Sequence, residues 1–376
     1  MAVIAALALA APAGAATAPL AYVVNQSGSD TGNVTPIDTA TNTVRSPIAV
    51  GSSPSSIAIT PDGATAYVTN QNEHDVTPID LTTNTGGPPI AVGRSPCSIA
   101  ITPDGATAYV ANYLDGTVTP IDIATNTPGQ PIAVGRYPCS IATTPDGDTA
   151  FVAHLDNDGF VTPIDIATNT SGPPIPIGSA ASSIAMTPDG DTLYVGAYDE
   201  VVIPIDTASN TPGTPIPVGG LPSSIGITPN GETAYVVDLF LSEEGPGPGS
   251  VIPVDLATQT PGPPIPVGHF PQALAITPDG ATAYVANTVS SSVTPIDTTT
   301  NMPGTTIGVG GGPVSIAIAT PPEPRSPTNP ASNCRRLRMK LKRQKHGLRA
   351  ASSKRKHSMI ARNIRDTHRR MRKQGC

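Results

Sequence analysis

Residues 56–93 read SIAITPDGATAYVTNQNEHDVTPIDLTTNTGGPPIAVG, and residues 98–135 repeat them as SIAITPDGATAYVANYLDGTVTPIDIATNTPGQPIAVG. The proline of the TPDG or TPNG element falls at positions 61, 103, 145, 188, 229 and 278. Self-similarity at a nearly fixed period indicates a repeat architecture, in which every copy is one structural unit.

Each copy contains four short segments with the composition of β-strands: SIAIT, TAYVTN, VTPID and PIAVG. The β-branched and aromatic residues of the second segment favour a strand. The TPDG element between the first two predicts a turn, because proline fixes φ and glycine accepts a positive φ. Four short strands in every 40–45 residues, roughly, are typical of a propeller blade.

The repeating region does not begin at the first strand of a repeat. The array enters at AYVVN, residues 21–25, which is a second strand without a first, and it leaves at SIAIA, residues 315–319, which is a first strand without a second. Each strand type then occurs seven times. We therefore predict an all-β, seven-bladed β-propeller over residues 19–320, closed by pairing the N- and C-terminal strands, which removes an exposed edge.

One residue conflicts with this assignment. Every third strand contains a proline, as at Pro36 and Pro78, and a central strand does not tolerate proline. We expect the third strand to be a partial edge at this point, because the outer PIAVG strand is short and flanked by proline.

The segment Tyr67-Val68-Thr69-Asn70 resembles the signature of the YVTN-repeat β-propellers, and variants of it stand at 22–25, 109–112 and 284–287. More distantly, the chain is similar to the seven-bladed lactonases and streptogramin lyases. The resemblance implies a secreted or surface protein of bacteria or archaea, in a family mostly without assigned chemistry. No catalytic motif of those enzymes aligns here, and the fold alone does not give a function.

Charge divides the chain into two parts. Residues 1–322 carry 26 Asp and Glu against three Arg, a net of −23, and residues 323–376 carry 18 Lys and Arg against two acids, a net of +16. Every lysine lies in the second part, which excludes a Schiff-base lysine or a P-loop from the propeller. The acidic propeller would also repel nucleic acid and anionic membranes.

The N-terminal segment, residues 1–18, is apolar and rich in small residues, with a small-residue cleavage site at Ala13-Gly14-Ala15. It resembles the end of a secretory signal peptide, although no Lys or Arg precedes the apolar run. We expect a bacterial protein that is secreted or at the cell surface. No later run is long and apolar enough for a transmembrane segment, and we expect a monomer.

The C-terminal part begins with a Pro-rich linker, residues 321–333, followed by a basic segment, 334–376, that we predict to be an α-helical hairpin. Apolar residues recur there at helical spacing. They are Leu337, Leu341, Leu348, Ile360, Ile364 and Met371. Cys334 and Cys376 stand at its two ends, so we predict a disulfide between them. Three hypotheses remain for this hairpin: it binds anionic cell-envelope polymers, its own acidic propeller, or nucleic acid. Export counts against the last.

Repeats provide an internal control for finding a site. The recurring Asp residues of TPDG and PID, such as Asp62 and Asp80, are predicted to be turn residues. Distinctive side chains gather instead in the connections between second and third strands and between blades, which lie on one face of a propeller. The candidate ligand-binding residues there are Arg94, Arg136, Tyr137, His154, Tyr198, Asp238 and His269. The signature's fourth position is His154, Ala197 and Asp238 in three successive copies. Relaxed selection, without any small-molecule site, is the competing interpretation.

Metal ligands and cysteines give weaker predictions. His154, Asp156, Asp158 and Asp238 are the weak candidates for a metal such as Ca²⁺, although loop Asp residues are more often turn formers. We otherwise expect no cofactor. Cys97 and Cys139 occupy the same position in adjacent copies, and we expect two buried thiols, with a disulfide as the alternative.

Two functions remain open. The first is a non-enzymatic scaffold that binds a protein or a polysaccharide through one loop face and is tethered to anionic envelope polymers by its basic tail. The second is a metal-dependent enzyme, similar to a lactonase or lyase, with its site on the same face.

Overall fold

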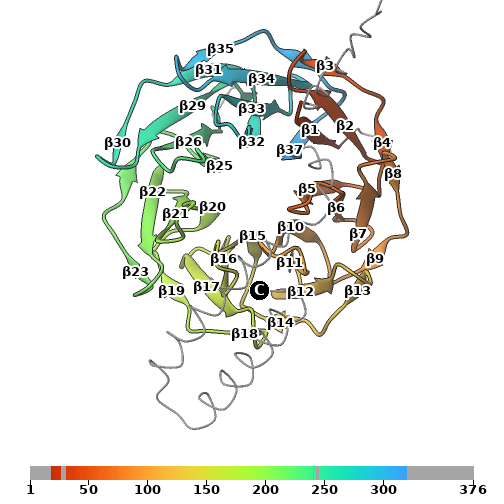
Figure 1. The fold of residues 1–376 in the computed structure, drawn as a ribbon. Coiled ribbons are helices and arrows are strands. Elements are labelled where there is room, and N and C mark those ends of the chain that lie inside the picture. Colours follow the sequence, from red (N-terminus) through yellow and green to blue (C-terminus); the bar gives the residue numbers. More distant parts are fainter. Residues whose placement is uncertain (1–17, 27–30, 240, 243–244, 320–376) are drawn as a thin grey trace, which may run out of the picture. The chain divides into compact units, whose positions relative to one another are not determined.

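The computed structural model describes residues 18–26, 31–239, 241–242 and 245–319, which form a ring of seven β-sheets around a central axis (Figure 1). The predicted seven-bladed propeller is confirmed. The linker 321–333, the hairpin 334–376 with its Cys334–Cys376 disulfide, and residues 1–17 lie outside the described residues. Within the described part of the chain, no helix is long and apolar enough to cross a membrane, as the sequence predicts.

Strands of four ranks build each blade, from the axis outward. The first strands are β5 (Pro54–Ile59), β10 (Pro96–Ile101), β15 (Pro138–Thr143), β20 (Ala181–Met186), β25 (Pro222–Ile227), β32 (Pro271–Ile276) and β37 (Pro313–Ala319). The second strands are β1 (Leu20–Asn25), β6 (Thr65–Asn70), β11 (Thr107–Asn112), β16 (Thr149–His154), β21 (Thr192–Ala197), β26 (Thr233–Asp238) and β33 (Thr282–Asn287). The third strands are β2 (Asn33–Asp38), β7 (Asp75–Asp80), β12 (Thr117–Asp122), β17 (Phe160–Asp165), β22 (Val201–Asp206), β29 (Pro248–Asp255) and β34 (Ser292–Asp297).

The outermost rank is divided into two short strands in every blade. The first pieces are β3 (Thr43–Val44), β8 (Thr85–Gly86), β13 (Thr127–Pro128), β18 (Thr170–Ser171), β23 (Thr211–Pro212), β30 (Thr260–Pro261) and β35 (Met302–Pro303). The second pieces are β4 (Ile48–Ala49), β9 (Ile90–Ala91), β14 (Ile132–Ala133), β19 (Ile175–Pro176), β24 (Ile216–Pro217), β31 (Ile265–His269) and β36 (Ile307–Gly308). The sequence predicts only the second piece.

The third-strand proline explains this division. In β2, Pro36 pairs with Tyr22 on the inner side, and its carbonyl accepts a hydrogen bond from Arg45 N on the outer side at 2.8 Å. A residue's N and C=O face the same side of a strand, so the missing N–H of Pro36 also faces outward. There the outer strand is interrupted between β3 and β4. The predicted partial edge is confirmed.

Blade 1 consists of β37 and β1–β4, and blades 2 to 7 follow in chain order. Strand β37 pairs with β1 in antiparallel register from Leu20↔Ala319 to Asn25↔Pro313. The ring is therefore closed by its terminal strands, as predicted. Seven apolar clusters, each between two neighbouring blades, form the core.

The tyrosine of the repeat signature links neighbouring blades. The hydroxyl of Tyr67 in blade 2 donates to Asn126 Oδ1 in blade 3 at 2.6 Å, and the hydroxyl of Tyr284 in blade 7 donates to Asn42 Oδ1 in blade 1 at 2.8 Å. Asn42 and Asn126 adopt φ values of 55° and 54°, in the left-handed region that Asn tolerates better than most residues. A buried tyrosine thus gains a partner for its hydroxyl while its ring fills the core.

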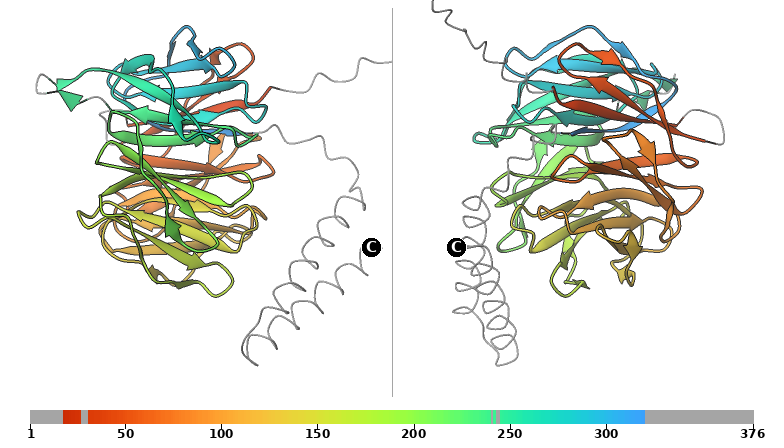
Figure 2. Two further views of the ribbon diagram at one scale, coloured as in Figure 1. Left: turned by 90° about the vertical axis from the view of Figure 1, so that its left-hand side faces the viewer. Right: turned by 45° about the vertical axis from the view of Figure 1, so that its right-hand side comes forward.

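The connections define two faces. The lower face carries the turns from first to second and from third to outer strands. The upper face carries the connections from second to third strands and from each blade to the next. Leu20 and Ala319, which pair at the ends of their strands, both lie at the lower face. A hairpin of β27 (Leu241–Ser242) and β28 (Gly245–Pro246) projects from blade 6 on the upper side (Figure 2).

Candidate binding face

The lower-face aspartates are structural. Asp62 Oδ1 accepts hydrogen bonds from Thr60 Oγ1 at 2.6 Å and from Ala64 N at 3.1 Å, and Asp80 Oδ1 accepts from Thr82 N at 2.8 Å. The hydrogen bonds from Thr82 lower the pKa of Asp80. The prediction that the recurring acids are turn residues is confirmed.

The fourth signature position is also structural in the copies that carry Asn. Asn112 is fully buried, its amide donates to Thr119 Oγ1 at 2.8 Å, and its Oδ1 accepts from Gly93 N at 3.1 Å. Asn287 repeats this pattern with Thr294 and Gly268. The side chain therefore joins the third strand of its own blade to the connection that enters from the preceding blade.

His154 performs the same task in blade 4. Its Nδ1 lies 2.7 Å from the Arg136 carbonyl oxygen, so this nitrogen carries a proton and donates it, and its Nε2 lies 3.0 Å from Thr162 Oγ1. The side chain is fully buried, and burial lowers its pKa. Both ring nitrogens already contact protein groups, so the structure places this predicted ligand-binding residue in the core rather than on the surface.

In blade 4 the residue that packs against His154 also differs from the other repeats. The imidazole stacks on Phe160, with ring centroids 4.1 Å apart. In five other blades the residue at this place in the third strand is polar and contacts the signature side chain, as Asn33 does with Asn25 at 2.9 Å, whereas blade 5 carries Val201 opposite Ala197. The same position holds Asp75, Thr117, Ser250 and Ser292 in four further blades. The His–Phe pair thus replaces a polar pair, and comparing both positions across the repeats would have revealed it from sequence.

Asp238, the third departure, is only half-buried. Its Oδ2 accepts a hydrogen bond from Ser250 Oγ at 3.2 Å, and Oδ1 is buried with no hydrogen-bond partner among the described residues. Burial raises its pKa, and the nearby Glu200 raises it further. This carboxyl group borders the insertion of blade 6, part of which lies outside the description.

The candidate metal ligands are not brought together. No group of three or more His, Cys, Asp or Glu in the described part of the chain is arranged to hold a metal ion. Asp156 lies near enough to His154 to favour its protonated form, but Asp158 and Asp238 do not join them. A Ca²⁺ site stays a prediction that this geometry does not support.

Two further predicted residues are separated from this region. Arg94 Nε donates to Asp115 Oδ1 at 2.6 Å in a solvent-exposed ion pair, which contributes little to stability. The backbone N of His269 donates to Ser290 Oγ at 2.8 Å, between blades 6 and 7.

Tyr113 and Tyr137 come together on the upper face, and Tyr198, on the same rim, lies near enough to raise the pKa of Tyr113; we name these three residues the tyrosine cluster. The rings of Tyr113 and Tyr137 lie 5.0 Å apart between centroids, tilted by 32°. Tyr137 is 41% exposed and Tyr198 is 50% exposed. Burial, followed by the influence of Tyr137, two cysteines and Tyr198, raises the pKa of Tyr113. The cluster therefore draws on three successive blades: Tyr113 follows the second strand of blade 3, Tyr137 precedes the first strand of blade 4, and Tyr198 follows the second strand of blade 5.

Cys97 and Cys139 lie beneath this cluster. Both are free thiols, as expected from the sequence, and each donates to the first strand of the next blade: Cys97 Sγ to Pro138 O at 2.9 Å and Cys139 Sγ to Ala181 O at 3.2 Å. Burial raises the pKa of Cys97 to about 12 and raises that of Cys139 as well. These thiols are therefore protonated and poor nucleophiles at neutral pH.

The backbone explains why the cluster lies near the axis. In every blade, the residue after the second strand donates its N–H to the carbonyl oxygen of the residue directly before the first strand, as Tyr113 N does to Ser95 O at 3.0 Å and Tyr198 N to Ala180 O at 3.0 Å. These positions extend the two innermost strands upward. They are polar or small in blades 1 and 2 (Gln26, Gly312, Gln71, Ser53) and largely apolar in blades 3 to 6 (Tyr113, Ser95, Leu155, Tyr137, Tyr198, Ala180, Leu239, Leu221). Half of the upper rim is thus apolar, a contrast the sequence analysis missed.

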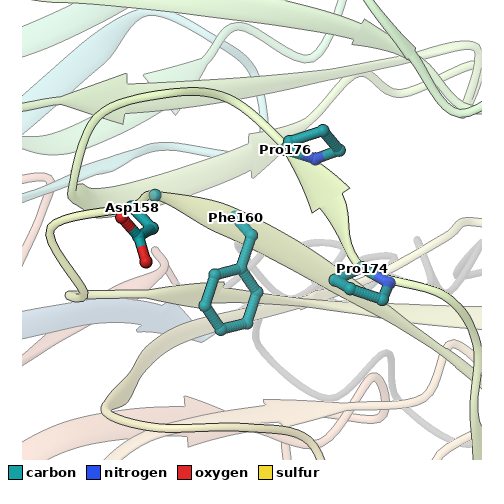
Figure 3. Close-up of a pocket in the computed structure, with 5 residues that line it drawn as sticks. Asp158, Phe160, Pro174 and Pro176 are labelled. Atoms are coloured by element: carbon teal, nitrogen blue, oxygen red, sulfur yellow. The ribbon is translucent and has the colours of Figure 1, made fainter.

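A separate hollow of about 310 Å³ lies on the outer side of blade 4, lined by Asp158, Gly159, Phe160, Pro174 and Pro176 (Figure 3). Asp158 lies on one side of the Phe160 ring and Pro174 on the other. A ligand site usually combines apolar walls with several convergent polar groups. Only Asp158 supplies a charged side chain here, so this hollow is a weaker candidate than the tyrosine cluster.

Comparisons with known proteins agree with the fold. A family model described as "Lactonase, 7-bladed beta-propeller" matches residues 25–162. Over these residues the chain is similar to the seven-bladed lactonases. The predicted distant similarity to lactonases is thereby confirmed, whereas the YVTN name stays a prediction. No curated protein matches the chain.

Two solved structures share the propeller. Kuenenia stuttgartiensis hydrazine synthase is 24% identical, with a TM-score of 0.65, over 70% of this chain and 88% of that one. A functionally unknown protein from Desulfotomaculum acetoxidans DSM 771 is 18% identical, with a TM-score of 0.68, over 80% of this chain and 99% of that one. At these identities the similarity shows the fold alone.

Proposed function

We propose that this protein is a secreted or cell-surface propeller that binds a ligand through its upper face and is tethered to anionic envelope polymers by its basic tail. The observation that carries the proposal is the contrast between the faces. Lower turns repeat one sequence and satisfy their own polar groups, whereas the upper rim changes from blade to blade and exposes Tyr137 and Tyr198. Binding residues usually lie on variable loops held by a rigid scaffold.

The tether follows from charge and connectivity. Residues 323–376 carry a net charge of +16, with apolar residues at helical spacing. The described chain ends at Ala319, on the lower face. The opposite charges of the propeller and the tail support two separate tasks for the two parts.

Deletion of residues 323–376 tests the tether. We expect the full chain to bind anionic cell-wall polymer in a pull-down assay and to be released by added salt, because these charges are screened over about 10 Å at 0.1 M ionic strength. The truncated protein should not be retained. Equal retention of both proteins would contradict the tether.

The family match also favours a second candidate, a metal-dependent enzyme similar to a lactonase. Specific binding of a metal raises apparent stability. Thermal unfolding in the presence of Ca²⁺, Mg²⁺ or Zn²⁺ therefore separates the two candidates. A saturable increase in Tm that is lost in Asp156→Asn would favour the enzyme, and unchanged Tm values with all three ions favour the scaffold.

A further inference from the structure

The backbone of Tyr137 determines how this side chain is presented on the upper rim. Tyr137 adopts φ 51°, in the left-handed region where a large L-residue is strained. The corresponding residues Ser53, Ser95 and Phe270 adopt φ 51°, 56° and 55°, so this conformation belongs to the repeat, and an aromatic side chain occupies it in two blades. Tyr137 packs its ring against Tyr113 and is still 41% exposed. The conformation presents an aromatic face to the solvent.

Carboxylates lie on the same connections as the cluster. Asp156 follows Leu155 on the rim of blade 4, and Asp199 and Glu200 directly follow Tyr198 in blade 5. None of these three forms an ion pair among the described residues, where the ion pairs are Arg45–Asp38 and Arg94–Asp115. Among the described residues of these connections, Arg136 is the one Arg or Lys outside those two ion pairs. The balance on the rim is therefore negative, within a propeller that is itself strongly acidic.

We propose that the tyrosine cluster, with Asp156, Asp199 and Glu200, binds a segment of a partner protein that carries several Lys or Arg side chains. A cation is attracted to the face of an aromatic ring, and the flanking carboxylates add attraction of the same sign. Exposed Tyr side chains are also enriched among the residues that dominate protein interfaces. This inference rests on the proposed function, since it names the ligand of the upper face.

A segment fits the arrangement better than a single small cation. The three rings belong to the connections of three successive blades, and the carboxylates lie on two of those blades. A small ammonium ion would contact one ring pair, whereas a chain with spaced cationic side chains reaches all three rings. Acidic ligands would meet three carboxylates against one arginine.

The test measures the affinity of the full-length protein for a fluorescent eight-residue peptide of alternating Lys and Gly, by anisotropy at low salt. A matched peptide of alternating Glu and Gly and an anionic polyuronate serve as comparison probes. Tyr137→Ser and Tyr198→Gln are the main variants, because Ser53, Ser95 and Gln71 occupy the equivalent positions in other blades and show that the fold accepts these residues. Val289→Ser is the control, since Val289 is exposed on blade 7, outside the cluster.

We expect the Lys peptide to bind and each tyrosine substitution to weaken it about tenfold, in the range of a cation–π contact plus lost contact area. Arg136→Gln should tighten binding about threefold by removing a like charge, and Val289→Ser should change nothing. The opposite effect of Arg136→Gln, a loss of affinity, would overturn the inference because it indicates an anionic ligand.

The remaining outcomes separate this inference from the proposed function. If the Lys peptide does not bind but the Glu peptide or the polyuronate binds and loses affinity in Tyr137→Ser, the cationic partner is wrong while the binding face stands. If no probe depends on either tyrosine, both are wrong. Binding of the Lys peptide only after deletion of residues 323–376 would overturn the partner assignment in favour of the chain's own basic tail.

Discussion

The two faces of this propeller are built by the same strands, yet they differ in almost every respect. On the lower face, aspartates such as Asp62 and Asp80 are bound by the threonines and backbone groups of their own turns. On the upper face, the rim of blades 1 and 2 is polar or small, whereas that of blades 3 to 6 is largely apolar. A repeat protein can vary one set of connections freely while the other preserves the blade, and the contrast shows where binding has room to develop.

The largest effect on stability is expected where β37 pairs with β1 and closes the ring, between the two faces. Ile316 in β37 is buried between blades 7 and 1. Ile316→Ala should lower the free energy of unfolding by about 2–5 kcal/mol, because a buried cavity remains. Urea denaturation followed by circular dichroism measures this loss. A change below about 0.5 kcal/mol would mean that β37 does not close the ring.

A smaller effect is expected from the tyrosine links between blades. Tyr67→Phe removes the hydrogen bond to Asn126 and should cost about 1 kcal/mol. The chain supplies its own reverse experiment, because blade 4 carries Phe151 at this position and Asn210 adopts φ 55° in the next blade. Phe151→Tyr should therefore raise Tm in thermal unfolding. If both substitutions lower Tm equally, the packing of the ring, and not the hydrogen bond of the hydroxyl, stabilises the contact between blades.

His154 should make the stability of the native protein depend on pH more strongly than that of a His154→Asn variant. Because burial lowers its pKa in the folded state, the unfolded chain takes up a proton near pH 6.5 that the folded protein does not. This term leaves stability unchanged above that pH and reduces it as the pH falls below it. His154→Asn, which supplies the amide found at Asn112, should therefore lose less Tm than the native protein between pH 7.5 and 5. Parallel Tm profiles of the two proteins would show that His154 is not held neutral.

The smallest effect on stability is expected at the upper rim. Tyr198 is half exposed, and Tyr198→Gln introduces the residue that blade 2 carries as Gln71. The free energy of unfolding should stay within about 0.5 kcal/mol of the native value. Calorimetry provides the measurement. A loss as large as that from Tyr67→Phe would make the tyrosine a structural residue and remove the distinction between the faces.

The sequence predicted the propeller well because its information is local and periodic. The TPDG turns and the strand composition appear within a single copy, and the phase of the repeat follows from the segments at the two ends of the array. The division of the outer strand could be predicted only in part, since it depends on which side of β2 the nitrogen of Pro36 faces. Register decides this, and register appears only when the strands are paired.

The candidate site was harder to predict. His154 departs from the repeat and lies on a loop-bearing face, so sequence reasoning assigned it to ligand contact, yet its departure accompanies Phe160 inside the core. Tyr113 and Tyr137 are 24 residues apart and belong to different connections, but their rings lie 5.0 Å apart. A departure from a repeat therefore indicates a local change, and only its neighbours show whether that change concerns packing or binding.

The most direct test of the account is a map of where a bound ligand protects the backbone. Hydrogen–deuterium exchange of the full-length protein, with and without the Lys–Gly peptide, compares the two faces in one experiment. We predict slower exchange in residues 113–116, 135–137, 155–159 and 198–200, with the TPDG turns unchanged. Protection confined to the lower-face turns, with none in these four upper segments, would contradict the account.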